Sequence, residues 1–321
     1  MKQSQILGQI KKELAKARTA LVMCHVDPDA DTVGSMVAMM LILKGLGKRV
    51  KMLSLDPLPH TYDFLPHVRE IKCHISANER FDVAITVDAG DVGRLGGLLL
   101  KNHSKLVINI DHHPDNTMYG GINLVEKVSS TAELIYDLCK YLKVPITKDI
   151  ATCLYTAIIT DTGNFRYENT AVSTFNIAAD LVKSGASPSI IASAIYENNP
   201  VSSLRLLALS LNRIRTAFGG KVVWSVVTLS MIKSANAAGE DITGIVDHIR
   251  SVMGASVAIL FREEPAGLIK INLRSRNKVN VGKIANSLGG GGHARASGVV
   301  MRGPLNSVIK KVLNAVSKHV A

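Results

Sequence analysis

The sequence predicts an α/β protein of two domains: an N-terminal domain with a doubly wound, mostly parallel sheet, and a smaller C-terminal α+β domain. At 321 residues the chain is longer than one hydrophobic core usually organises. In its first two thirds, short apolar runs of strand length alternate with helical segments, as in a parallel sheet with crossover helices. Beyond residue 200 the pattern changes to strands joined by short turns.

In the first domain, the expected strands are short apolar runs of the kind buried inside parallel sheets: 19–24, 49–55, 82–87 and 106–110. The expected helices lie between or beside them: an amphipathic helix over 3–17, one over 33–46 that ends before Gly47, and several between 130 and 196. Breaks in this last stretch are expected at Pro145, 161–163 and 185–188.

The segment Glu197-Asn198-Asn199-Pro200 is typical of a chain break, and a helix is expected to follow over 204–217. We therefore expect a catalytic domain over 1–196, a linker helix within 197–217 and a second domain over 218–321. The elements expected in the second domain are a strand over 222–229, a hairpin of 256–263 and 268–276, and helices over 281–288 and 305–319.

The net charge of +12 favours polyanionic partners such as nucleotides, although a generally basic proteome would produce the same balance. No apolar stretch reaches the roughly 20 residues that a membrane span needs, and the N-terminus lacks a secretory apolar core, so a cytoplasmic location is expected. The four cysteines are scattered without a CxxC pair, which indicates neither a zinc ribbon nor a disulfide framework.

Acidic and histidine residues gather directly after the predicted strands. The segment 25–31 (HVDPDAD) follows the first strand, Asp88 follows the third, and 111–113 (DHH) follows the fourth. A further aspartate, Asp161, ends a helical run. Taken singly, such residues also serve as turn residues or helix caps. Together they are expected at one edge of the sheet, where parallel α/β sheets bind ligands.

Six of these residues pool into a ligand set of carboxylates and imidazoles: His25, Asp29, Asp31, Asp88, His112 and Asp161. One ion needs three or four ligands, so six suit two ions with one carboxylate shared. The oxygen-rich set favours manganese, magnesium or cobalt over an all-thiolate zinc site. Two such ions close together clamp a phosphoryl group for in-line displacement.

The second domain carries four consecutive glycines, Gly289, Gly290, Gly291 and Gly292, followed by His293 and Arg295. Because each glycine costs backbone entropy, we interpret them as allowing close approach to a ligand and not as packing residues. A flexible surface loop is the alternative. Around Ser275, the residues Arg274 and Arg276 lie two apart on one face of a predicted strand, where guanidinium groups suit phosphate oxygens or are simply solvated.

The motifs HVDPDAD, VDAGD, DHH, TDTGNF and GGGGHARASG, in this order, resemble a DHH phosphoesterase with a DHH-associated nucleotide-binding domain. Order and length are most similar to the bacterial branch that degrades very short RNA and 3′-phosphoadenosine 5′-phosphate (pAp). The resemblance spans nearly the whole chain and implies a manganese pair, with substrate held in an interdomain cleft. The substrate-binding residues it implies are Arg274, Ser275, Arg276, Gly289, Gly290, Gly291, Gly292, His293 and Arg295.

By the same resemblance, His25 and Asp29 would hold one ion, Asp31, His112 and Asp161 the other, and Asp88 would bridge them. The two aspartates at 29 and 31 would alternate along an extended loop and face different ions. The resemblance also implies catalytic roles for Asp88 and for His113 near the leaving oxygen.

Three neighbouring residues receive lesser roles. Asp111 is expected to orient a histidine. Asp27 is interpreted as a turn residue or a supporting carboxylate, and Arg166 as a weaker candidate for contacting phosphate.

Several alternatives remain open from the sequence. Linear pApA or cyclic di-AMP would suit the same motifs, and a homodimer is compatible with them. The GGGGH segment argues against a pyrophosphatase of the superfamily. With aromatics at 4%, the chain offers little for stacking a long single strand, and no separate module for long nucleic acid is evident. A non-catalytic nucleotide- or RNA-binding module is the alternative outside the enzymes.

Overall fold

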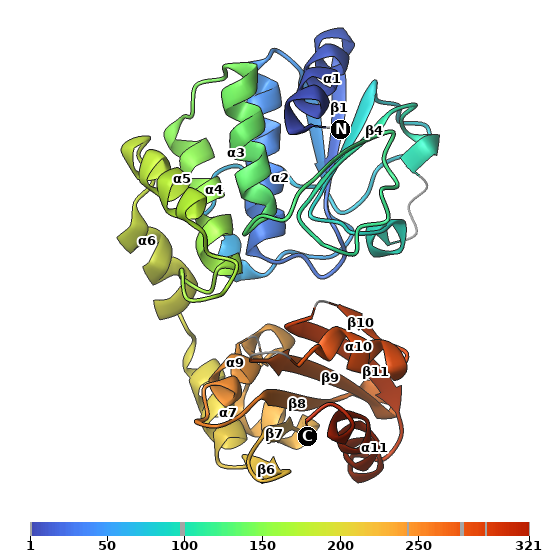
Figure 1. Ribbon diagram of the computed structural model, residues 1–321, viewed down its shortest axis with the longest axis vertical. Helices are drawn as coiled ribbons and strands as arrows, with labels where there is room; N and C mark the ends of the chain where they lie inside the picture. Colours follow the sequence, from blue (N-terminus) through green and yellow to red (C-terminus); the bar gives the residue numbers. More distant parts are fainter. Residues whose placement is uncertain (1, 97–99, 243, 277–278, 293, 321) are drawn as a thin grey trace. The chain divides into compact units, whose positions relative to one another are not determined.

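The computed structural model describes the chain except for residues 1, 97–99, 243, 277–278, 293 and 321. The described residues form two compact units, 1–198 and 199–321 (Figure 1). Among the described residues, no helix is long and apolar enough to cross a membrane.

The first unit contains a five-stranded sheet in the order β2-β1-β3-β4-β5. All its strand pairs are parallel, which confirms the predicted sheet. The strands are β1 (Thr19–Met23), β2 (Arg49–Leu53), β3 (Val83–Val87), β4 (Val107–Asp111) and β5 (Ile122–Val125). The edge strand β5 was not predicted, because only one of its four residues is buried and its sequence lacks a continuous apolar run. The chain order reverses between β1 and β3, which is the switch point where such sheets bind ligands.

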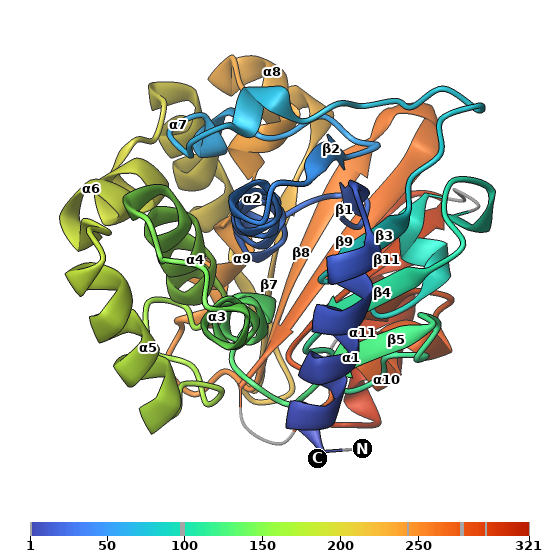
Figure 2. The same ribbon diagram turned by 90° about the horizontal axis from the view of Figure 1, so that it is seen from above.

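Helices cover one face of this sheet. Next to it lie α1 (Gln3–Lys16), α2 (Ala30–Gly45) and α3 (Thr131–Leu142). Beyond α2 lies α4 (Lys148–Asp161), so α2 is buried almost all round, between the sheet and α4 (Figure 2). The other face of the sheet packs against a smaller apolar cluster beneath the short turns η3 (Val92–Leu95) and η4 (Leu100–Asn102).

The remaining helical elements of the unit are α5 (Val172–Lys183), α6 (Pro188–Ala192), η1 (His60–Tyr62), η2 (Val68–Glu70) and the π-helix η5 (Ser193–Glu197). The helix expected over 33–46 begins earlier, at Ala30, because Asp29 acts as its N-cap and accepts a hydrogen bond from the Thr32 N–H. Asp31 therefore lies in the first helical turn, and the expectation that an extended loop carries both aspartates is wrong for Asp31.

The second unit contains a six-stranded mixed sheet in the order β10-β11-β9-β8-β7-β6. Among the strands described, β7 and β8 pair in parallel and the other neighbours pair antiparallel. The strands are β6 (Arg215–Ala217), β7 (Val222–Val227), β8 (Val257–Glu264), β9 (Leu268–Ser275), β10 (Gly291–Gly292) and β11 (Ala296–Arg302). The predicted hairpin is confirmed as β8 and β9, joined by the turn η7 (Pro265–Gly267).

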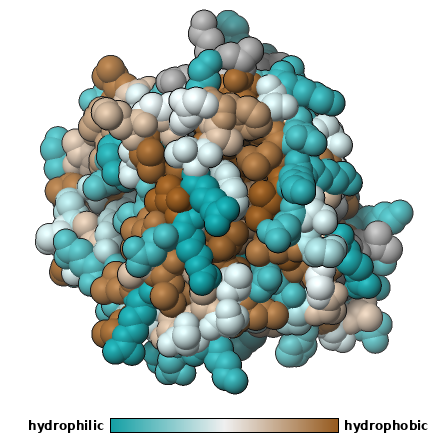
Figure 3. Space-filling view, turned by 90° about the horizontal axis from the view of Figure 1, so that it is seen from below, coloured by the Kyte–Doolittle hydropathy of each residue, from teal (hydrophilic) through white to brown (hydrophobic). Residues whose placement is uncertain are grey.

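Helices cover both faces of this sheet, with a separate apolar cluster under each set. One face carries α10 (Val281–Ser287) and α11 (Leu305–Ser317), and the other carries α7 (Val201–Leu211), α8 (Leu229–Ala235) and α9 (Ile245–Arg250), with the turn η6 (Gly239–Ile242). The surface seen in Figure 3 mixes hydrophilic and hydrophobic areas.

The helix expected over 204–217 is too long at its C-terminal end. The helix α7 ends at Leu211, and Arg215 begins the edge strand β6, which pairs with β7. The Arg215 guanidinium lies 5.7 Å from the ring centre of Trp224 on β7, a cation–π contact that favours the strand over a further helical turn.

Candidate metal centre

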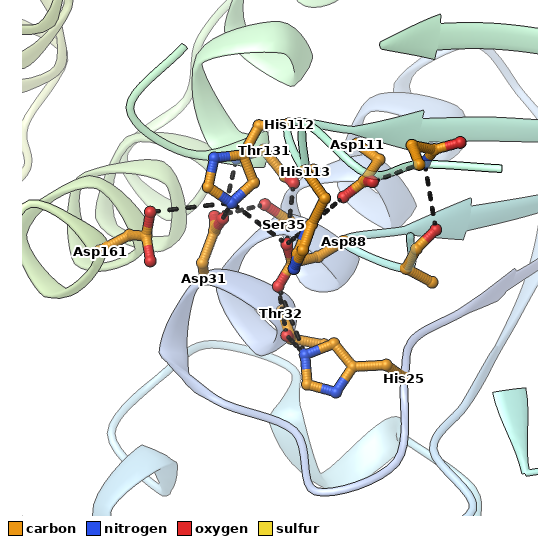
Figure 4. Close-up of polar contacts among 12 residues, drawn as sticks. His25, Asp31, Thr32, Ser35, Asp88, Asp111, His112, His113, Thr131 and Asp161 are labelled. Atoms are coloured by element: carbon orange, nitrogen blue, oxygen red, sulfur yellow. Dashed lines mark hydrogen bonds and ion pairs between the residues drawn. The ribbon is translucent and has the colours of Figure 1, made fainter. Parts of the chain in front are cut away.

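The fold brings the predicted ligand residues together at the carboxyl ends of three neighbouring strands (Figure 4). His25 lies two residues beyond β1, Asp88 directly follows β3, and His112 directly follows β4. Asp31 and Asp161 come from the helices α2 and α4. Residues that are far apart in the sequence therefore surround one point at the switch between β1 and β3.

The first group consists of His25, Asp29 and Asp88, whose ligand atoms all lie within 4.8 Å of one another. At its centre lies the Thr32 hydroxyl, 2.7 Å from His25 Nε2, 2.8 Å from Asp29 Oδ1 and 2.6 Å from Asp88 Oδ2. One hydroxyl has a single proton and cannot donate to three acceptors at once. This excess of acceptors is what a cation would balance.

The second group consists of Asp31, His112 and Asp161, again with ligand atoms within 4.8 Å. His112 Nε2 lies 3.9 Å from Asp31 Oδ2 and 3.7 Å from Asp161 Oδ2. These distances are too long for hydrogen bonds. They agree with the separation of about 3–4 Å between neighbouring ligand atoms of one divalent ion.

Asp88 lies between the two groups, as its predicted bridging role requires. Its Oδ2 faces His25 at 3.5 Å, and its Oδ1 faces His112 at 3.6 Å. The side chain is 3% exposed, and the backbone is left-handed, with φ of 58°. For an aspartate this conformation is uncommon, and such backbone strain concentrates at functional sites. The Thr131 hydroxyl also donates to Asp88 Oδ1, at 3.1 Å.

The two histidines of these groups are oriented in the same manner. Each directs Nδ1 to a backbone carbonyl, His25 to Val26 at 2.6 Å and His112 to Val128 at 3.3 Å. In this tautomer Nδ1 carries the proton and Nε2 presents its lone pair to the carboxylates. Metal-binding histidines show this arrangement regularly.

The charges at this edge of the sheet also favour a cation. Burial raises the pKa of Asp31 well above its usual range, reinforced by the carboxylates of Asp88 and Asp161. Burial likewise raises the pKa of Asp161 to about 7, although His112 opposes this. Against its burial, the pKa of Asp88 is lowered by the neighbouring imidazoles of His25, His113 and His112. In the described part of the chain, no lysine or arginine forms an ion pair with these carboxylates, so a bound divalent ion would supply the missing positive charge.

His113 also lies near Asp88 and forms a third possible ligand group with Asp88 and His112. Its orientation differs from that of the other two histidines. The atom that faces Asp88, Nδ1 at 3.6 Å, lies only 2.6 Å from Asp111 Oδ1, to which it donates its proton. A protonated nitrogen offers no lone pair to a metal, so Nδ1 is not a ligand in this arrangement, and the catalytic role expected of His113 stays a prediction. Asp111, fully buried, thus orients His113, and Asn116 donates to its second oxygen at 2.5 Å.

Two residues with lesser expected roles lie outside the three groups. Asp27 is exposed in a left-handed turn, where its N–H donates to Asp56 at 2.7 Å. Arg166 folds back so that its Nε donates to the Gly163 carbonyl at 2.6 Å, in the turn that follows Asp161.

Sequence reasoning missed Thr32 and Thr131, which contact the ligand Asp88. It also missed Arg94 and Asn116, which contact His113 and Asp111 beside the ligands. Of these, only Thr32 carried a signal, since it stands three residues after Asp29, in the spacing of an N-cap and its third helical residue.

In the second unit, the predicted substrate-binding residues gather where β9 meets β11. Arg274 pairs with Ala296 across the two strands, and the Ser275 N–H donates to the Arg295 carbonyl at 3.0 Å. The side chain of Ser275 is buried, whereas Arg276 is exposed one residue beyond β9. The Arg274 guanidinium lies 3.5 Å from Asp247. His293, the histidine of the GGGGH motif, lies outside the described residues.

The glycine run corrects one expectation. A Cβ at Gly290 would lie 2.2 Å from the Gly298 carbonyl oxygen, and one at Gly292 would lie 2.7 Å from Ser297 Cα. These two glycines are therefore needed for packing of β10 against β11, contrary to the sequence interpretation. Gly289 and Gly291 meet no atom closer than 3.7 Å and leave their surroundings open.

Comparison with known proteins agrees with this architecture. Residues 19–158 match the N-terminal domain of the DHH family, and residues 219–321 match the DHHA1 domain. The chain is 34% identical to the bifunctional oligoribonuclease and PAP phosphatase NrnA of Thermus thermophilus over 92% of this chain and 88% of that protein. The chain therefore belongs to the DHH family of phosphoesterases and is a hydrolase.

A more distant relative and a solved structure are also similar to this chain. The NrnA of Mycoplasma genitalium is 29% identical over 86% of each chain. A solved structure, an exopolyphosphatase-related protein from Bacteroides fragilis, has a TM-score of 0.91 at 24% identity and covers 98% of this chain and 96% of its own, which shows a shared fold. Membership among these hydrolases leaves the non-catalytic binding module without support.

Proposed function

We propose that this phosphoesterase hydrolyses very short oligoribonucleotides to 5′-mononucleotides and pAp to AMP, with two divalent ions, most suitably manganese. The observation that carries the proposal is Asp88, a buried carboxylate placed between a His25 group and a His112 group. The similarity to proteins named oligoribonuclease and PAP phosphatase supports the choice of substrates.

The residues present fit two ions. Six ligand atoms from carboxylates and imidazoles suit manganese better than zinc in a thiolate site. When bound, such a pair lowers the pKa of an attacking water and neutralises charge on the phosphoryl group. His25 and Asp29 would hold one ion, Asp31, His112 and Asp161 the other, and Asp88 would contact both.

The two proposed reactions share one chemical step. Cleavage of RNA to 5′-mononucleotides and removal of the 3′-phosphate of pAp both break a bond between phosphorus and a ribose 3′-oxygen. One site therefore serves both reactions. A further phosphate of the substrate would be bound by the second unit, through Arg274, Arg276, Arg295 and the open glycines, which favours short substrates with two phosphates.

A cytoplasmic location stays a prediction.

The test is a substrate panel with manganese: pAp, a short RNA, pApA, cyclic di-AMP, pyrophosphate and a long single strand. Asp88→Ala should lower turnover of pAp and short RNA together by at least about 100-fold, because one carboxylate serves both ions. Asp27→Asn is the matched control, since Asp27 is an exposed aspartate of the same segment and lies outside the ligand groups. Near-normal activity with unchanged metal content in Asp88→Ala would refute the bridging role, and preferred hydrolysis of cyclic di-AMP would redirect the substrate assignment.

A further inference from the structure

One arginine beside the metal centre belongs to none of the predicted substrate-binding residues. Arg94 is half-buried in the turn η3, and its Nη1 lies 3.2 Å from His113 Nε2. Its backbone is held at both ends: the N–H donates to Asp91 Oδ1 at 3.3 Å, and the carbonyl accepts from the Val26 N–H at 2.9 Å, next to the ligand His25. The guanidinium is therefore fixed near the ligand cluster by local structure.

One assignment of protons to Arg94 and His113 fits all of these contacts. A guanidinium is always charged and has no acceptor, so Arg94 must donate and His113 Nε2 must accept. The proton of the neutral imidazole is then on Nδ1, where Asp111 accepts it at 2.6 Å. As a result, Nε2 of His113 has no proton to give in this arrangement. The N–H donors at this position belong to Arg94.

The charge of Arg94 is not neutralised by a carboxylate. Within the described part of the chain, Arg94 makes no ion pair, and its side chain makes one hydrogen bond, to an uncharged ring. Its other N–H groups remain available. A half-buried guanidinium held by a neutral acceptor keeps both its full charge and most of its fork geometry for an anion, and phosphate oxygens match that fork.

We propose that Arg94 binds a non-bridging oxygen of the substrate phosphate at the metal centre, and that His113 is the positioning residue that orients the guanidinium. The proposal rests on the phosphoesterase site described above and adds a phosphate contact to it. Asp111 and Asn116 act indirectly, because they hold His113 in the tautomer that accepts a hydrogen bond from Arg94.

The experiment compares the full-length wild type with Arg94→Ala, Arg94→Lys and the control Arg80→Ala. Arg80 is an exposed arginine of the same unit, whose guanidinium donates to the carbonyls of Ala77 and Glu79. Three quantities are measured: bound manganese, the affinity of the manganese-loaded protein for inorganic phosphate, and kcat/KM for pAp. Arg94→Ala should keep its manganese, bind phosphate roughly 10- to 100-fold more weakly and lose a similar factor in kcat/KM. Arg80→Ala should match the wild type.

Two further readouts separate contact from structural support. Added guanidinium ion should partly restore the activity of Arg94→Ala but not that of Arg94→Lys, whose side chain fills the space. His113→Gln should weaken phosphate binding, and it should weaken it no further in the Arg94→Ala background, because the two residues act as one unit.

Unchanged phosphate affinity in Arg94→Ala, or loss of manganese from it, would overturn the proposal. A wild type that binds phosphate through Arg94 but hydrolyses neither pAp nor short RNA would instead overturn the proposed function alone.

Discussion

Gly34 allows α2 and α4 to approach closely, and its replacement by alanine tests whether this contact sets the metal centre. A Cβ at this position would lie 2.5 Å from the Cys153 carbonyl oxygen on α4 and 3.2 Å from Ala157 Cβ. Ordinary contact begins near 3.4 Å, so the helices must separate by about 0.9 Å (3.4 minus 2.5). Because α2 is enclosed by the sheet, α4 must move. Alanine contributes about 1 kcal/mol of helix propensity, and overpacking against backbone costs about 1–3 kcal/mol or more.

The net expectation for Gly34→Ala is a loss of up to about 2 kcal/mol, which in a unit of this size lowers Tm by up to about 8 °C. The metal centre should also respond, because α2 carries Asp31 and α4 carries Asp161. A displacement of about 0.9 Å exceeds the ~0.5 Å tolerance of such constellations. Manganese should therefore be lost from the group of Asp31, His112 and Asp161 before the group of His25, Asp29 and Asp88.

Thermal unfolding of the metal-free protein and manganese titration measure these two effects. The control is Gly8→Ala in α1, where the Cβ meets only the Tyr141 hydroxyl, at 3.4 Å, so the substitution should stabilise by up to about 1 kcal/mol. Opposite signs for the two substitutions are the expected result. A Gly34→Ala variant with wild-type Tm and metal binding would refute the reasoning.

Three further predictions concern pH. Manganese binding requires ionised carboxyls, but the pKa of Asp161 is raised to about 7 and that of Asp31 well above its usual range. Manganese affinity should therefore rise between about pH 6 and pH 8, with release of protons. Calorimetry in buffers of different ionisation enthalpy measures this release, and pH-independent binding would contradict the prediction. Since these pKa values are higher in the folded protein than in the unfolded chain, the two groups should also lower the stability of the metal-free protein as pH rises from 3.8 towards 7. Asp82 should act in the opposite direction, because hydrogen bonds from the N–H groups of Arg18 and Thr19 lower its pKa, and the ionised side chain therefore stabilises the fold above its unfolded pKa of about 3.8. The stability deficit of Asp82→Asn should shrink as the pH falls below about 3.8, and a deficit that stays constant there would exclude the charge as its cause.

The ligand set could be anticipated from the sequence because five of its members lie in the segments that follow strands, and the sixth, Asp161, ends a helix. Asp88 illustrates why the pattern was informative. An aspartate after a strand is an ordinary helix cap, but the parallel topology places it beside His25 and His112 whatever the intervening sequence. The order of strands, and not the residue itself, made the prediction specific.

The supporting residues could not be anticipated in the same way. Thr32 and Asp88 are 56 positions apart, and Arg94 and His113 are 19 apart, so neither contact leaves a local pattern. The glycine run misled for a different reason. The entropy cost of four glycines was explained by ligand binding alone, whereas Gly290 and Gly292 also allow the β10 segment to approach the backbone of β11.

The ligand cluster is held in place by groups other than a metal. Both oxygens of Asp31 accept backbone N–H groups at the start of α3, from Thr131 at 2.8 Å and Ala132 at 3.2 Å. Both oxygens of Asp88 accept threonine hydroxyls. These donors fix the carboxylates without neutralising their charge, since neither an N–H group nor a hydroxyl carries a full positive charge. Burial, together with the neighbouring carboxylates, therefore keeps the pKa values of Asp31 and Asp161 raised. A cation is therefore favoured electrostatically while the protein itself needs little rearrangement to receive it, and the stability that the folded chain loses by holding the carboxylates together is recovered when the ion binds.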